Sequence, residues 1–158
     1  MKKIIFLLIA VPFFLIGCGS DNDVNLVTYD NGELEKELKE EGIQPKLPTK
    51  FPIVIVEHEL SIPPPPTPKG QFPVYYTGEN GEYFELMIWD RPVTWEEIST
   101  YEKVDINGNE SFYMSDEAYT STLHWEDGDY YYILQYHHQS SETKITKGDL
   151  INIAESFK

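Results

Sequence analysis

The sequence predicts an α+β domain in which an antiparallel β-sheet built of hairpins packs a C-terminal helix on one face. Three dipeptides typical of tight turns each separate two strand-like segments; they are Asn80-Gly81, Asn107-Gly108 and Asp127-Gly128. Residues 119–137 alternate between apolar and polar side chains, as expected for a sheet with one buried face. Apolar residues then recur at helical spacing between residues 150 and 157.

The first 17 residues have the composition of an export signal. Lys2 and Lys3 precede an apolar run from Ile4 to Gly17, which is shorter than the roughly 20 residues that a membrane-spanning helix needs. The run ends in Leu15-Ile16-Gly17-Cys18, which resembles the bacterial lipobox, whose cysteine is acylated and becomes the mature N-terminus. The alternative, a buried strand that contains a cysteine, does not explain the two lysines. We therefore expect a signal peptide over residues 1–17 and a lipid anchor on Cys18.

Charge and cysteine content exclude several classes of function. The 158 residues include 12 basic and 27 acidic ones, and loss of residues 1–17 would leave 10 basic residues and a net charge of −17. A surface of that sign repels phosphate groups, so nucleic acid is not an expected partner. Cys18 is the only cysteine, so its acylation would leave no thiol for disulfides or catalysis.

The boundary of the folded domain is predicted from composition. Residues after Cys18 are small, polar and acidic, which is typical of a solvated linker. We therefore expect a lipidated flexible tether over residues 18–29 and a single α+β domain over residues 30–158. The first element of the domain is a short surface helix from Asn31 to Glu41, with Leu34 and Leu38 on its apolar side.

Two segments between this helix and the hairpins have distinct patterns. Ile53-Val54-Ile55-Val56 is apolar on both faces and predicts an interior strand. The prolines between Pro63 and Pro68 predict a stiff polyproline II connector, with a docking site for a proline-binding partner as the alternative.

Three hairpins and a single helical turn beginning at Thr94 follow. The paired strands are Val74–Thr77 with Glu82–Asp90, Tyr101–Ile106 with Ser111–Ser115, and Tyr119–Glu126 with Asp129–His137. Asn-Gly and Asp-Gly suit primed turns of two residues.

The register of the last hairpin follows from its turn. If Asp127 and Gly128 are the two turn residues, Trp125 pairs with Tyr130, and one face of the hairpin is almost wholly apolar. The other face is then polar and directed to water. The Tyr130-Tyr131-Tyr132 triplet would provide two core side chains and one exposed ring, that of Tyr131.

Tyr131 and Ile133 are the large apolar side chains on that polar face, and this makes them candidate contacts for a protein partner. Tyrosine is enriched among interface residues that contribute most to affinity. The alternative is a cross-strand pair between Tyr131 and His124 that stiffens the hairpin.

The C-terminal segment predicts a helix capped by Thr146, with Asp149 at the third helical position. Its apolar stripe, which should pack on the aromatic face of the sheet, comprises Leu150, Ile151, Ala154 and Phe157.

Several segments in this order carry a family resemblance. They are Leu47-Pro48-Thr49-Lys50-Phe51, Glu82–Trp89, Val104–Gly108, Leu123–Gly128 with Tyr131–Leu134, and Asp149–Phe157. Over about residues 45–158 the chain resembles a family of uncharacterised Gram-positive extracytoplasmic domains. These domains occur at the C-termini of sporulation-type lipoproteins and of some membrane-anchored anti-sigma factors, and are distantly similar to lipoprotein-carrier folds. The resemblance implies the fold and implies no catalytic residues.

No motif predicts catalysis. The chain has no Gly-x-Ser-x-Gly elbow and no glycine-rich phosphate loop. Glu57-His58-Glu59 is the candidate metal ligand set, but solvated residues at a strand end are the better interpretation. We expect no catalytic residues, no metal and no cofactor.

The expected protein is therefore a bacterial lipoprotein, anchored through its lipid at the extracytoplasmic face of the cell membrane. It would act as a non-catalytic binding or sensing domain with an envelope protein as partner. The alternative is a carrier-like protein that holds a lipid or acyl chain between sheet and helix. An apolar cavity under the sheet would favour the carrier, and a flat aromatic patch would favour a protein partner.

Overall fold

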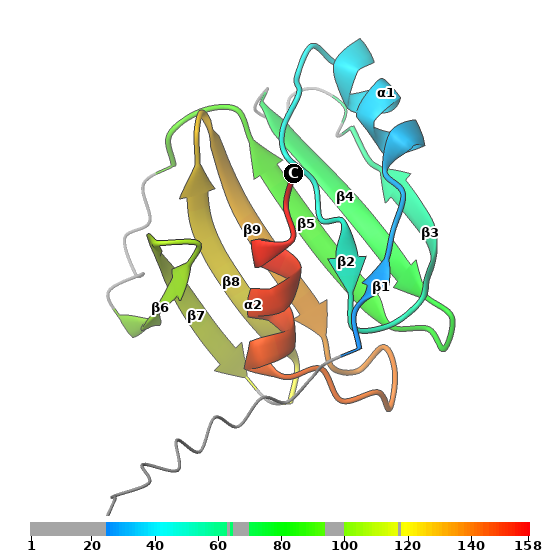
Figure 1. Cartoon of the computed structure of the whole chain (residues 1–158), viewed down its shortest axis with the longest axis vertical. Helices are drawn as coiled ribbons and strands as arrows, with labels where there is room; N and C mark the ends of the chain where they lie inside the picture. The colour runs from blue at the N-terminus through cyan, green and yellow to red at the C-terminus, as the bar shows by residue number, and fades with distance from the viewer. Residues whose placement is uncertain (1–24, 63, 65–69, 94–99, 117) are drawn as a thin grey trace, which may run out of the picture.

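The computed structural model describes residues 25–62, 64, 70–93, 100–116 and 118–158, and it confirms an α+β fold (Figure 1). In chain order the elements are β1 Val27–Thr28, α1 Gly32–Glu40, β2 Lys50–Phe51, β3 Ile55–Leu60, β4 Gln71–Gly78, β5 Tyr83–Trp89, β6 Glu102–Ile106, β7 Asn109–Asp116, β8 Thr120–Asp127, β9 Tyr130–His137 and α2 Lys147–Glu155. The main sheet is antiparallel with the order β3-β4-β5-β9-β8-β7-β6, and β1 pairs with β2 in a small second sheet. Among the described residues, no helix is both long and apolar enough to cross a membrane.

One face of the main sheet, which we call the core face, is covered by α2 and by the β1–β2 pair (Figure 1). Aromatic rings fill this layer. Trp125 and Tyr132 stack with centroids 5.1 Å apart, and Phe157 packs edge-on against both rings at 5.1 and 5.3 Å. The prediction that the C-terminal segment packs on the aromatic face is confirmed.

The folded part begins before residue 30. Val27 and Thr28 pair with Phe51 and Lys50, and the ring of Tyr29 packs edge-on against Phe51. Paired backbone and ring contacts are incompatible with a flexible tether, so residues 27–29 belong to the folded part and not to the tether that was expected to extend to residue 29. Its residues 18–24, and the signal peptide expected over residues 1–17, lie outside the described residues.

The helix predicted over Asn31 to Glu41 is confirmed as α1. Leu34 and Leu38 are fully buried, as their spacing predicted. The helical turn expected at Thr94 lies outside the described residues, as does the proline segment apart from Pro64.

The prediction that Ile53–Val56 forms an interior strand is wrong. Ile55 begins β3, which is an edge strand of the main sheet, and Val54 and Val56 are exposed. A β-branched run predicts extended backbone, but its position within a sheet depends on which strands assemble beside it.

The three hairpins are confirmed, and their turns differ in type. Asn107 and Gly108 both have positive φ values, 52° and 85°, as a type I′ turn requires. In the first hairpin only Gly81 has a positive φ, and the N–H of Gly78 bonds to the carbonyl oxygen of Glu82. The primed turn expected at Asn80-Gly81 is therefore a three-residue loop that ends in a left-handed glycine.

The last hairpin is displaced from the predicted register. Gly128 and Asp129 form its turn, because Asp127 pairs with Tyr130, and Trp125 therefore pairs with Tyr132. A displacement of two residues keeps every side chain on its predicted face, so the core face was predicted correctly.

The second face of this hairpin is directed to water only in part, whereas the alternation predicted a solvated face. Thr122, His124 and Tyr131 are all buried there. The ring of Tyr101, just before β6, lies 5.3 Å from that of His124, and Phe112 on β7 is its cross-strand neighbour. The polar residue at position 124 predicted exposure to solvent, but the neighbouring rings of Tyr101 and Phe112 cover it.

Helix α2 has the predicted capping box, with reciprocal bonds between Thr146 and Asp149. Leu150 and Ala154 are buried as expected, whereas Ile153 takes the inward position that was assigned to Ile151.

Candidate functional site

Two adjoining hollows lie at the tip of the β8–β9 hairpin, with volumes of about 440 and 280 Å³. Both are lined by the cross-strand pair Glu126 and Tyr131, and we call the two hollows together the tip groove. Its other lining residues are Asp90, Arg91, Pro92, Asn109, Glu110, Phe112, Trp125, Gly128, Asp129 and Tyr130. The β8–β9 turn is at the end of the sheet opposite the point where β1 begins (Figure 1).

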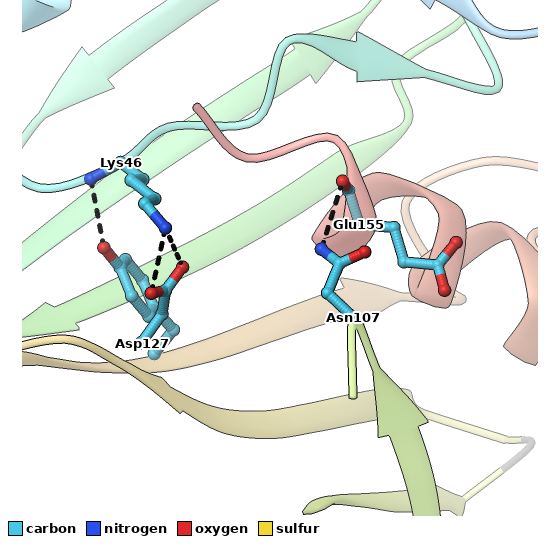
Figure 2. A network of polar contacts seen from close by, with 5 residues as sticks. Lys46, Asn107, Asp127 and Glu155 are labelled. Atoms are coloured by element: carbon cyan, nitrogen blue, oxygen red, sulfur yellow. Dashed lines mark hydrogen bonds and ion pairs between the residues drawn. The ribbon is translucent and has the colours of Figure 1, made fainter. Parts of the chain in front are cut away.

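The hairpin tip is held by the segment that follows α1. Gly128 has a φ of 65° at the first turn position, which glycine adopts without strain. The Nζ of Lys46 lies 2.7 Å from a carboxylate oxygen of Asp127, and the backbone N–H of Lys46 donates to the hydroxyl of Tyr132 at 3.1 Å (Figure 2). The backbone N–H of Gln44 donates to the hydroxyl of Tyr130 at 3.0 Å. These hydrogen bonds and the ion pair hold the β8–β9 turn, which forms part of the tip groove, in place.

The tip groove is rich in negative charge. Glu110 forms an ion pair with Lys103 at 2.8 Å, and the guanidinium of Arg91 lies 5.6 Å from the ring centroid of Trp89. Within the described part of the chain, Glu126 and Asp129 have no ion pair with a basic side chain. Carboxylates next to aromatic walls favour a cationic group. Among the described residues that line the groove there is no serine, cysteine, lysine or histidine, and these residues therefore provide no serine or cysteine nucleophile with an adjacent base.

A comparison with protein-family models identifies a domain family for this chain. A family model described as "Domain of unknown function (DUF4367)" matches residues 67–157. The chain belongs to this family. DUF4367 is a domain known in some anti-sigma factors, which agrees with that part of the resemblance. No curated protein and no solved structure matches the chain.

The DUF4367 segment comprises β4 to β9 and α2, and so contains every residue of the tip groove. The elements β1, α1, β2 and β3 precede it. The hairpin tip of the family domain is therefore held by Gln44 and Lys46, which the family model does not include.

Of the predicted contact residues, the structure brings one into the tip groove. Tyr131 lines both hollows, but the residue is only 9% exposed, so the prediction of an exposed ring is wrong. It pairs with Glu126 rather than with His124. Ile133 lies two residues along the same face, is half-buried between His124 and Met87, and does not line the groove. Cys18 lies outside the described residues.

The histidines do not form a metal centre in the part of the chain that the structure describes. No group of three or more His, Cys, Asp or Glu side chains there could hold a metal ion. The Nδ1 atom of His58 lies 2.7 Å from the hydroxyl of Tyr29, and alternation along β3 places this ring on the opposite face from the exposed Glu57 and Glu59. Burial lowers the pKa of His124 to about 4.

Sequence reasoning missed the carboxylates of the tip groove. With 27 acidic residues in the chain, no acidic pair stood out. The usable signal was the register of the last hairpin, because moving the turn to Gly128-Asp129 places Glu126 directly opposite Tyr131.

Proposed function

We propose that this chain is a bacterial lipoprotein whose DUF4367 domain binds an envelope protein at the extracytoplasmic face of the cell membrane. It would perform no chemistry of its own. The lipobox-like Leu15-Ile16-Gly17-Cys18 and the basic, then apolar, segment before it support the anchor. Two acyl chains on Cys18 would hold the protein, since a single chain gives only reversible attachment.

The observation that carries the binding proposal is the location of the tip groove. A chain anchored through residues before β1 would have the tip groove at the membrane-distal end of the sheet, where a partner can approach (Figure 1). Exposed Glu126 and Asp129 would receive a basic side chain of the partner, and the aromatic walls would contact its aliphatic part.

Site-specific crosslinking in intact cells tests this binding site. A photoreactive side chain at Asp129 should form a discrete adduct, whereas the same group at Glu142, in the loop between β9 and α2, should not. Glu126→Lys should abolish the Asp129 adduct, because it reverses a charge at an exposed position of the groove wall. Glu142→Lys is the matched control. An adduct that survives Glu126→Lys, or that forms equally at Glu142, would remove the tip groove from consideration.

The anchor has its own test. Cys18→Ala should leave the membrane fraction or remain as an uncleaved precursor, and the mature wild-type protein should carry a diacylglyceryl mass on Cys18. A mature protein that is cut before Cys18 and has no added lipid mass would contradict the anchor.

The carrier alternative receives no support from the layer between sheet and helix. A carrier needs space for an acyl chain there, but Tyr132, Leu134 and Leu150 are fully buried and Phe157 packs between α2 and the sheet. An acyl chain would have to displace these side chains from their contacts.

A further inference from the structure

The outer edge of β3 is open in the described structure. β3 pairs with β4 on one side, and the strand order contains nothing beyond it. The N–H of Ser61 donates to the carbonyl oxygen of Pro73 on β4 at 2.9 Å. Because backbone groups alternate in direction along a strand, those of Leu60 and His58 are directed away from β4. These groups are available to another strand.

Exposed apolar side chains are concentrated along this edge of the sheet. Val54, Val56 and Ile62 are 40%, 61% and 45% exposed, and they account for half of the large exposed hydrophobic residues in the described part of the chain. Edge strands are commonly protected by lysine, proline or short length. β3 has six residues with neither lysine nor proline, and Glu57 and Glu59 are its charged side chains.

The surroundings of the edge are acidic. A groove of about 430 Å³ between α1 and β3 is lined by Tyr29, Asp30, Glu33, Glu37, Val56, Glu57 and His58, so its lining within the described ranges includes no lysine or arginine. Four of these seven residues are carboxylates, and Glu59 follows Glu57 on β3. A second copy of this chain would bring the same negative charge to the edge, whereas a basic segment would be attracted.

We propose that the outer edge of β3 binds an extended, lysine- or arginine-bearing segment of a partner protein, which adds to the sheet as an eighth strand. Backbone hydrogen bonds to Leu60 and His58 would supply affinity, and the side chains of the segment would supply specificity. Its apolar side chains would cover Val56, while its basic ones would meet Glu57 and Glu59 on one face and the α1 carboxylates on the other. This surface lies outside the segment that the DUF4367 model matches and is independent of the tip groove.

A synthetic peptide of alternating lysine and valine is the probe, measured by fluorescence anisotropy against the full chain in non-ionic detergent micelles. It should bind, and the same peptide with N-methyl groups on alternate residues should bind at least about tenfold more weakly, because those amides can no longer pair with β3. A glutamate–valine peptide should not bind. Equal binding of the methylated peptide would show general charge attraction and overturn strand addition, as would no binding of the lysine–valine peptide.

Variants locate the binding to β3. Val56→Lys and Glu59→Lys should each weaken binding by about tenfold, whereas Glu142→Lys, an equal charge change at a distant loop, should have little effect. Both β3 positions are exposed, so the variants should keep the wild-type melting temperature, and either one suffices if the other fails to fold. Unchanged binding in a folded β3 variant would overturn the proposal. The proposal would also be overturned if sedimentation showed a dimer of the wild-type chain and Val56→Lys dissociated it, because the edge of β3 would then pair with a second copy.

Discussion

Glu82, the residue just before β5, has a buried carboxylate that the sequence did not single out. It accepts hydrogen bonds from the backbone N–H of Asn80 at 3.0 Å and from the hydroxyl of Thr143. Burial raises the pKa of the Glu82 carboxyl, but these hydrogen bonds outweigh it and leave the pKa below its usual value. The charged carboxylate therefore joins the first hairpin to the loop before α2.

Glu82→Ala should lower the free energy of unfolding by about 2–4 kcal/mol, because it removes a buried acceptor and leaves its donors without a partner. Urea unfolding monitored by tryptophan fluorescence measures this loss. Glu79→Ala, at an exposed position of the same turn, should change stability by less than about 0.5 kcal/mol. Equal losses in the two variants would mean that the Glu82 bonds contribute little.

His124 should make the protein less stable in mild acid. Burial lowers its pKa from 6.5 to about 4, so the unfolded chain binds a proton between these values more readily than the folded one. The stabilisation is complete above pH 6.5 and is lost as the pH falls toward 4, by about 3 kcal/mol at most. Unfolding free energies of wild type and His124→Gln, measured at about pH 7.5 and about pH 4.5, should show a shallower pH dependence in the variant. If the unfolding free energies of the two proteins fell equally between these pH values, His124 would not be the group that destabilises the protein in acid.

Among the secondary-structure elements, two glycines should respond oppositely to the same substitution. Gly148 lies in the first turn of α2, where an added Cβ would meet only the Thr146 hydroxyl at an ordinary 3.7 Å. Gly148→Ala should therefore stabilise the protein by about 0.5–1 kcal/mol, since alanine loses less entropy in a helix. Gly108→Ala should destabilise it by about 1 kcal/mol, because φ is +85° in the β6–β7 turn. Thermal melts of both variants test the sign, and destabilisation by Gly148→Ala would contradict the expectation.

Local signals predicted most elements but not their neighbours. Turn dipeptides and the Thr146 cap act within a few residues, so the hairpins and α2 could be predicted from sequence. The edge position of Ile55 on β3 and the burial of His124 depend on which strands and rings lie beside them after folding. The turn at Gly128-Asp129 was displaced because Asp-Gly and Gly-Asp both suit a two-residue turn.

The candidate site could be predicted only in part, because its residues are brought together by the strand order of the whole sheet. Tyr131 was assigned to the correct face, because alternation fixes the face of a strand. The groove around it combines the segment after β5 with β7 and the β8–β9 turn, which meet only because β9 lies between β5 and β8. That strand order joins parts of the chain that no local pattern connects.

The charge of the whole molecule predicts a response to salt. With 27 acidic and 12 basic residues, the folded state concentrates negative charge that the unfolded chain spreads out. Raising NaCl from about 20 to about 300 mM should raise the melting temperature, because the Debye length falls below 10 Å and screens this repulsion. Sucrose at equal osmolality is the control for excluded-solute effects. A melting temperature that falls with salt would mean that the surface ion pairs, such as Lys46–Asp127, outweigh the repulsion.

The joining of the chain's early and late segments affects the order in which the protein can fold. The Thr49 N–H donates to the hydroxyl of Ser156, 107 residues further along, and Leu47 and Lys158 exchange two backbone bonds. Closing so long a loop costs entropy before its contacts repay it, which slows folding. At a synthesis rate of about 5–20 residues per second, the β2 segment emerges roughly 5–20 s before its partner exists. During that interval Phe51 lacks part of its covering layer, so apolar surface of the unfinished domain stays exposed until Ser156 has been added.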